Sequence, residues 1–308
     1  MTAPGPDRIT LGAFAGAVAI GGSNFVAVKF SNDDLDPLFG AGIRFAAAAL
    51  LLLLLMRAQR LPAPRGRAAT GAATYGLLAF GVSYGLLYFA LQGLSAGTAA
   101  VLMATTPLIT LVLAVLHRQE RFTARGIAGG LLAVAGLAVI SVDSLGGDLR
   151  PAYLLAALLG VVAVAESSVL VKGFPQAHPI TTNAIGMVAG ALLLLAASLV
   201  FGEDWTVPAT ARTWGVLAWL VVPGSIGLFA LFVFVIKRWT ASATVYALTL
   251  MPVVAITLGA VLADEPVTVE LVAGGALVMA AVYVGALSVS KTPAAVPEAA
   301  PAADAASV

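Results

Sequence analysis

Two charged side chains, Arg44 and Glu166, lie inside long apolar stretches, where a charge costs about 2.5–3.5 kcal/mol at a membrane helix centre. Arg44 lies ~10 Å into its segment at 1.5 Å per residue, so it either anchors a substrate carboxylate or pairs with an acid of the next loop such as Asp36. Glu166 is either a proton-coupling or cation-binding residue, or a side chain that extends back to water. Asn24 would hold a ligand or a neighbouring helix.

Three aromatic residues, Phe80, Tyr84 and Tyr88, recur every four positions and therefore lie along one helix face. One interpretation is packing or lipid contact. The other is a flat wall that suits a planar aromatic ligand, because a buried tyrosine hydroxyl usually finds a polar partner.

Two prolines, Pro107 and Pro252, fall near the middle of apolar segments, and each frees the carbonyl four residues earlier, that of Met103 or of Leu248. Such a kink serves either packing or a central cavity, where a freed carbonyl can be satisfied. The neighbouring polar contacts would be Thr105, Thr106, Tyr246 and Thr249.

The elements that position these residues are membrane helices. Hydrophobic residues make up 60% of the 308 positions and charged residues 10%, with a mean hydropathy of +1.01, unlike a soluble domain. A spanning helix needs about 20 apolar residues. Ten segments meet this requirement: 9–29, 37–56, 70–91, 95–116, 124–141, 151–171, 181–201, 214–236, 240–262 and 268–288.

The second half of the chain repeats the first. A shift of 145 positions without a gap places identical residues on one another: Ala96 on Ala241, Pro107 on Pro252, Glu120 on Glu265, Thr123 on Thr268, and Gly129-Gly130 on Gly274-Gly275. We assign residues 1–145 to the first repeat, 146–290 to the second and 291–308 to a disordered cytoplasmic tail. Each repeat has five segments, an odd number, so the second copy must be inverted in the membrane.

Inverted repeats place a site at their interface near the midplane and allow alternating access. Lysine and arginine gather at alternate connections, which predicts cytoplasmic N- and C-termini. We expect Thr123 and Thr268 to cap helices, Glu120 and Glu265 to shape the adjacent turns, and three glycine pairs to allow close helix contact: Gly12/Gly16, Gly126/Gly130 and Gly186/Gly190.

Other classes of function lack the residues they need. The chain has no cysteine and two histidines, His117 and His178, both in expected loops. A membrane enzyme would need a cluster of His, Asp or Glu at one face, and a channel would need a ring of polar residues. The sequence predicts no metal, no cofactor and no nucleic-acid partner, and a monomer is compatible with it.

Several stretches resemble the drug/metabolite transporter superfamily, specifically its EamA family: residues 22–29 (Gly-Ser-Asn-Phe-Val-Ala-Val-Lys), Pro37 with Gly42-Ile43-Arg44-Phe45, and Ala96, Pro107 and Glu120 with their second copies. The resemblance implies ten helices in two inverted five-helix repeats, a central cavity lined largely by the third, fourth, eighth and ninth helices, and export of small metabolites. Within the family the chain is most similar to YddG-type exporters of aromatic amino acids and paraquat.

The expected protein is therefore an all-α inner-membrane exporter of aromatic or neutral amino acids that works by alternating access. A broader drug or metabolite carrier is the alternative within transport, and a lipid scramblase or channel is the alternative outside it.

Overall fold

The computed structural model describes residues 7–120, 123–145, 151–175, 177–238 and 241–287. Secondary structure in these ranges is helical throughout. The ten spans are α1 (Arg8–Ser31), α2 (Pro37–Ala58), α3–η1–α4 (Arg67–Gly76, Leu77–Val82, Ser83–Ala90), α5–α6 (Ala96–Ala104, Thr106–Leu116), α7 (Ala124–Leu145), α8 with η2 (Pro151–Leu170, Val171–Gly173), α9 (Pro179–Phe201), α10–η3–α11 (Ala211–Val221, Val222–Gly227, Leu228–Arg238), α12 (Ala241–Leu262) and α13 with η4 (Val269–Val282, Tyr283–Leu287).

These spans confirm the all-α membrane fold and the ten segments expected from hydropathy. In the described part of the chain, seven spans are long and apolar enough to cross a bilayer, and three shorter apolar helices complete the set: 124–140, 247–262 and 269–285. The expected cytoplasmic tail, 291–308, lies outside the described residues.

Side-chain caps fix several helix ends. The hydroxyl of Thr123 accepts a hydrogen bond from the Gly126 N–H at 3.0 Å, and Thr268 accepts from the Leu271 N–H at 3.2 Å. Both predicted caps are therefore confirmed. Ser95 caps α5 in the same way, accepting from the Thr98 N–H at 3.0 Å, because a helix N-terminus leaves N–H groups without intrahelical partners.

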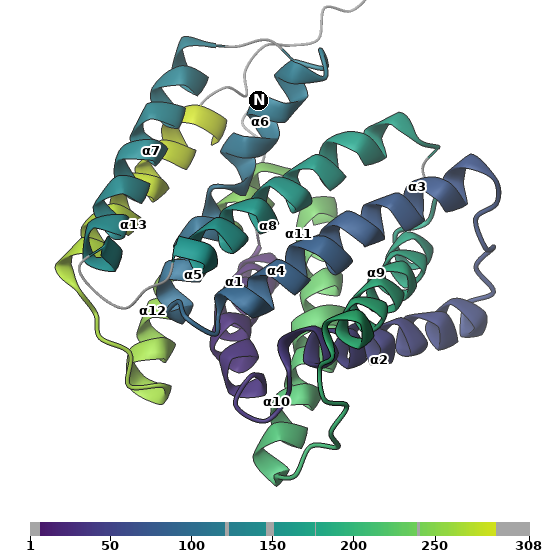
Figure 1. Ribbon diagram of the computed structural model, residues 1–308. Coiled ribbons are helices and arrows are strands. Elements are labelled where there is room, and N and C mark those ends of the chain that lie inside the picture. The colour runs from purple at the N-terminus through teal and green to yellow at the C-terminus, as the bar shows by residue number, and fades with distance from the viewer. Residues whose placement is uncertain (1–6, 121–122, 146–150, 176, 239–240, 288–308) are drawn as a thin grey trace, which may run out of the picture.

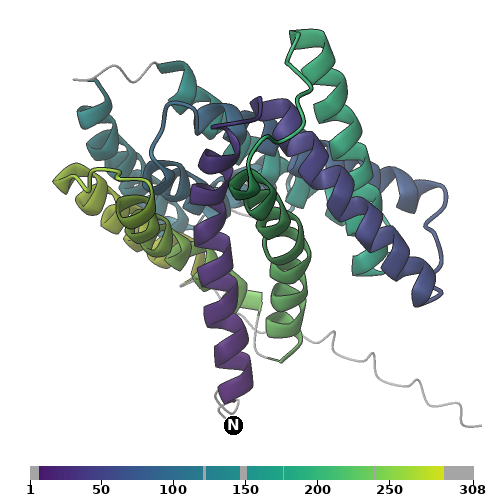
Figure 2. The same cartoon turned by 90° about the horizontal axis from the view of Figure 1, so that it is seen from below.

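Equivalent helices of the two repeats pack against one another. In Figure 1, α7 lies beside α13 at one end of the bundle, and α2 lies beside α9 at the other. These are the fifth span with the tenth and the second with the seventh. Seen from below in Figure 2, α1 runs through the middle of the bundle. Inverted repeats produce such pairing, since an axis in the membrane plane relates each helix to its own copy.

Two π-helical turns mark the same position in each repeat. η1 covers Leu77–Val82 and η3 covers Val222–Gly227, which coincide at the shift of 145. The Ser83 N–H donates to the Leu78 carbonyl, and the Leu228 N–H donates to that of Pro223, five residues back in each case. Single π turns inside α-helices are frequent at functional sites.

The two prolines act differently, although the sequence predicted twin kinks. The fourth span is interrupted at Thr105, between α5 and α6, with Pro107 in the first turn of α6. α12 continues through Pro252 without a break. The kink at Pro252 stays a prediction, because a proline can bend a helix without interrupting it.

Glycines allow close contact at one of the predicted pairs in particular. A methyl group on Gly190 would lie 2.6 Å from Phe80 Cβ, and one on Gly186 would lie 3.2 Å from Gly76 Cα, so α9 packs closely on η1 and α3. A methyl group on Gly12 or on Gly130 would have no atom of another segment within 4 Å. Those two glycines face open space instead of a helix contact.

Candidate functional site

A cavity of about 270 Å³ lies where α1, α2, α4, α5, α6, α8, α11 and α12 converge. It therefore draws on both repeats, as expected for a site at their interface. Five of the predicted site residues line it: Asn24, Arg44, Tyr84, Met103 and Thr106. The lining also includes Leu248, whose carbonyl Pro252 frees, and residues for which the sequence predicts no role, among them Phe25, Ser168, Phe232 and Met251.

Arg44 is the buried cation of this cavity, with 1% of its surface exposed. Its Nε donates to Ser225 Oγ at 3.2 Å, Nη1 donates to the Tyr88 hydroxyl at 3.3 Å, and Nη2 donates to the Gly224 carbonyl at 3.3 Å. The rings of Phe45 and Tyr84 flank the guanidinium carbon, with centroids at 5.0 and 5.1 Å.

All of these partners are neutral. Among the described residues no carboxylate lies within ion-pair distance of Arg44, and Asp36 instead accepts a hydrogen bond from the Asp204 N–H at 2.7 Å. The alternative of an Arg44–Asp36 pair is thus not found. A guanidinium has five N–H donors, so part of its capacity stays available beside the cavity.

The π turn η3 supplies the acceptors that hold Arg44 and Asn24. The Gly224 carbonyl accepts from Asn24 Nδ2 at 2.9 Å as well as from Arg44. Ser225 donates its hydroxyl to the Leu220 carbonyl at 2.8 Å, which orients its oxygen toward Arg44. A side chain at Gly224 would collide with the Asn24 amide. A π turn of the second repeat therefore positions two polar residues of the first.

Asn24 has one polar atom without a partner. Its Oδ1 is buried and accepts no hydrogen bond among the described residues. Such an atom is costly to leave unpaired, so a donor group on a ligand beside it would be stabilised.

The aromatic stripe divides between the cavity and the packing around it. Tyr84 lines the cavity and packs edge-on against Phe45, with centroids 4.8 Å apart. Tyr88 is fully buried and contacts Arg44 through its hydroxyl. Phe80 packs against Phe45 and Tyr75 and is not part of the lining. Phe25 and Phe232 complete the aromatic surface.

Only some of the residues around the two prolines line the cavity. Thr106 lines it and donates to the Met103 carbonyl at 2.6 Å, the group that Pro107 frees. Thr105 is buried and donates to the Leu102 carbonyl at 2.6 Å. On α12, Leu248 and Met251 line the cavity, while Thr249 and Pro252 are buried outside its lining. The side chain of Tyr246 lies outside the described residues.

Glu166 contacts His117, a pair that the sequence analysis did not anticipate. Glu166 Oε1 and His117 Nε2 are 2.8 Å apart, and the glutamate side chain is 23% exposed. The pair joins α8 to the end of α6 and does not belong to the cavity lining. Two residues 49 apart in the sequence (117 and 166) gave no local signal of this contact.

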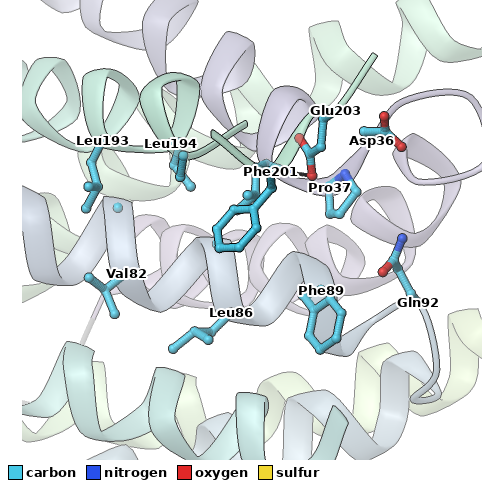
Figure 3. Close-up of a pocket in the computed structure, with 14 residues that line it drawn as sticks. Asp36, Pro37, Val82, Leu86, Phe89, Gln92, Leu193, Leu194, Phe201 and Glu203 are labelled. Atoms are coloured by element: carbon cyan, nitrogen blue, oxygen red, sulfur yellow. Dashed lines mark hydrogen bonds between the residues drawn. The ribbon is translucent and has the colours of Figure 1, made fainter. Parts of the chain in front are cut away.

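A larger groove of about 700 Å³ lies between α2, η1, α4 and α9. Figure 3 shows Phe89 and Phe201 beside it, with Asp36 and Glu203 toward one end. The Glu203 carboxylate accepts hydrogen bonds from the N–H groups of Leu38 and Phe39, at 3.0 and 2.8 Å. Phe201 is 76% exposed, so the groove opens on the outer surface of the bundle and is a weaker candidate for substrate.

Comparison with known proteins gives consistent results. The model of the EamA-like transporter family matches twice, at residues 8–142 and 151–286. The chain is similar to the uncharacterized inner membrane transporter YedA of Escherichia coli K12, at 34% identity over 281 residues that cover 89% of each chain. A crystal structure of another protein shares the fold, with a TM-score of 0.63 and 18% identity, over 91% of this chain and 96% of that one.

Two further relatives carry names that mention a substrate. A probable amino-acid metabolite efflux pump of Salmonella typhimurium is 26% identical over 87% of this chain and 91% of its own. A probable biotin transporter of Pseudomonas aeruginosa is 30% identical over 60% of this chain and 65% of its own. From the two family matches, the ten spans and the similarity to YedA, we conclude that this chain is a multi-pass membrane transporter, not an enzyme, and belongs to the EamA-like transporter family.

Proposed function

We propose that the chain exports small carboxylate-bearing metabolites, foremost aromatic and neutral amino acids, across the inner membrane by alternating access between its repeats. The observation that carries this proposal is the buried Arg44 guanidinium, which lies at a cavity between membrane helices with neutral partners only. A carboxylate is the ligand group that complements such a cation, because a guanidinium can bind both of its oxygens.

The other lining residues fit an amino acid. The open acceptor of Asn24 suits an ammonium group, and the rings of Phe25, Tyr84 and Phe232 offer an apolar surface to the side chain. The cavity volume of about 270 Å³ lies near the lower end of the roughly 300–1,000 Å³ typical of ligand pockets. A single amino acid therefore suits it better than a large drug.

The names of two relatives support the same chemical class. An amino-acid metabolite and biotin both carry a carboxylate, and these are the substrates that the Salmonella and Pseudomonas names mention. A carrier of other apolar carboxylates is thus the second candidate, favoured by Arg44 and the apolar lining. A lipid scramblase or channel would not need a buried cation at a cavity between its helices.

Glu166 remains the proposed coupling residue. A carboxylate within a span is by default a proton or cation site, and its contact with His117 provides a second group that can take up a proton. The proposed topology has both termini in the cytoplasm, as the distribution of basic residues predicts.

The test is counterflow in proteoliposomes. We expect liposomes loaded with unlabelled Phe, Trp or Thr to accumulate the labelled amino acid transiently and saturably, which separates a carrier from a channel or a scramblase. Biotin would be used as a competitor to compare the two carboxylate classes. The absence of counterflow for every amino acid with folded protein would refute the substrate assignment.

A further inference from the structure

One end of the bundle is held by an ion pair between the repeats. Lys29 Nζ, at the end of α1, lies 2.5 Å from Glu265 Oε1 in the connection between α12 and α13. The same carboxylate accepts two contacts from the Ala96 N–H at the start of α5, at 3.0 and 2.9 Å. Glu265 is 8% exposed. A shielded carboxylate that meets both an ammonium group and a helix N-terminus forms a strong contact.

The helices beneath this ion pair are closely packed. A methyl group on Gly97 of α5 would lie 2.6 Å from Ile256 Cγ1 of α12. A methyl group on Gly259 would collide with the Glu265 carboxylate. Ala96 and Ala99 are fully buried. The end of the molecule that contains Lys29 and Glu265 is therefore closed, and the Glu265 carboxylate lies over a glycine that makes room for it.

The repeat places a second set of the same residues at the opposite end. The shift of 145 carries Glu265 to Glu120 and Ala96 to Ala241. Lys29 corresponds to Lys172, because each follows a Val-X-Val sequence at the end of the first span of its repeat. The backbone supports this relation, since the Glu120 N–H donates to Ala114 O at 3.2 Å and the Glu265 N–H donates to Gly259 O at 3.1 Å.

The second set is apart in this structure. Glu120 and Lys172 are both exposed, and no ion pair joins them within the described ranges. Among the described residues, α5 packs extensively on α12 at the closed end, whereas no contact of similar extent joins α6 to α12 at the other end. The molecule is thus closed where the first set is bonded and splayed where the second set is not.

We propose that Lys29–Glu265 and Lys172–Glu120 are alternating latches, of which the first bonds in the state seen here and the second bonds in the state open to the other side. This inference rests on the alternating access of the proposed function but not on the substrate. Inverted repeats exchange conformations when the molecule switches state. Each latch then stabilises one state by an ion pair that the other state lacks.

The chain has no cysteine, so single reporters can be introduced directly. Ile256→Cys reports on the closed end, and Leu111→Cys, its counterpart at the shift of 145, reports on the splayed end. Both substitutions remove volume, so they do not force the helices apart. The readout is the rate of alkylation by a charged maleimide in detergent, which needs no substrate.

Removal of the first latch should expose the closed end. We expect Lys29→Met to raise the labelling rate at Ile256→Cys by about tenfold and to lower the rate at Leu111→Cys. The factor of about ten corresponds to an ion pair whose contribution to stability lies between those of exposed and of buried pairs. Glu265→Gln should act in the same direction. The matched control is Arg57→Met, which removes an exposed basic residue in the last turn of α2 and should leave both rates unchanged.

The second latch is tested in the Lys29→Met background. Adding Lys172→Met should return the Ile256→Cys rate toward the original value, because each state has then lost its ion pair. Lys29→Arg should keep labelling slow, because it retains the cation while Glu265 keeps its bonds to the Ala96 N–H. Circular dichroism and gel filtration would verify folding of each variant.

Two results would overturn the inference. If folded Lys29→Met and Glu265→Gln leave the labelling rate at Ile256→Cys unchanged, the first latch is refuted. If Lys172→Met has no effect on that rate in the Lys29→Met background, the second latch is refuted. Counterflow measured on the same variants keeps the proposals separate. If the labelling rates change but no amino acid shows counterflow, the latches are supported and the substrate assignment is rejected. If counterflow occurs but the labelling rates do not change, the substrate assignment is supported and the latches are rejected.

Discussion

Arg44 is the residue on which the proposed substrate recognition depends. It is buried among Ser225, Tyr88 and Gly224, and aromatic rings flank its guanidinium. Lysine carries the same charge but lacks the planar arrangement of five donors, so the two are not equivalent at a site that binds a carboxylate through two oxygens.

We therefore expect Arg44→Lys to raise the KM for amino-acid counterflow at least about tenfold, a loss of roughly 1.4 kcal/mol. Concentration-dependent counterflow measures this effect. Arg57→Lys is the control, because Arg57 is exposed in the last turn of the same helix and is not part of the cavity lining. An unchanged KM for Arg44→Lys would show that the guanidinium does not recognise substrate.

Glu166 allows a separate test of the driving force. If its carboxylate couples protons to export, Glu166→Gln should abolish the dependence of net flux on a pH gradient and leave counterflow intact, because exchange needs no net proton movement. Fluxes with and without an imposed gradient measure this. Equal sensitivity to the gradient in the variant and the unmodified protein would exclude Glu166 as the coupling group.

At the scale of elements, η3 is the part of the fold that builds the site. Its π turn presents the Gly224 carbonyl to both Asn24 and Arg44. Glycine is required at this position because of close approach, since its backbone φ is not in the left-handed region and the Asn24 amide occupies the space of a side chain.

We predict that Gly224→Ala lowers the free energy of unfolding by about 1–3 kcal/mol, as overpacking does, and weakens substrate affinity by displacing Asn24. Gly227→Ala is the matched control in the same π turn, where the nearest atom, the Val222 carbonyl oxygen, would lie 3.4 Å away. Thermal unfolding and counterflow on both variants make the comparison. Equal behaviour of the two variants would contradict the role given to Gly224.

The number and limits of the helices could be predicted because each span is an uninterrupted apolar run, and caps such as Thr123 and Thr268 mark their starts. The π turns could not be predicted, since nothing in residues 77–82 distinguishes them from an ordinary helix. The two prolines show the same limit. Their equivalent positions can be read from the sequence. Whether the helix is interrupted, as it is beside Pro107, or continues, as it does through Pro252, depends on the packing of the surrounding helices.

At the scale of the whole molecule, the inverted repeat links residues that are far apart in sequence. Arg44 meets Ser225 across 181 positions, and Lys29 meets Glu265 across 236. Arg44, Asn24 and Tyr84 could be selected from the sequence, and all three line the cavity, but their partners depend on how the repeats dock. It also treated Glu265 as a turn residue, whereas the structure shows it bonded to both Lys29 and the start of α5.

The orientation of the molecule gives a prediction at the same scale. We expect Glu120→Cys to react with a membrane-impermeant maleimide only after cells are permeabilised, and Val267→Cys to react in intact cells. Both side chains are exposed, so access depends on membrane side alone. Reaction of both positions from the same side would be incompatible with the inverted arrangement.

The paired π turns at 77–82 and 222–227 also determine where the length of each span can change. A π turn holds one residue more than the α-helical path it replaces, and each residue turns a helix by ~100°. Deleting a single amino acid from Leu77–Val82 would therefore restore a regular helix and leave Tyr84 facing the cavity, whereas a deletion in a regular part of the same span would rotate the residues on one side of it relative to the other. The π turns are thus the places where these two spans can lose a residue without changing which side chains face the cavity.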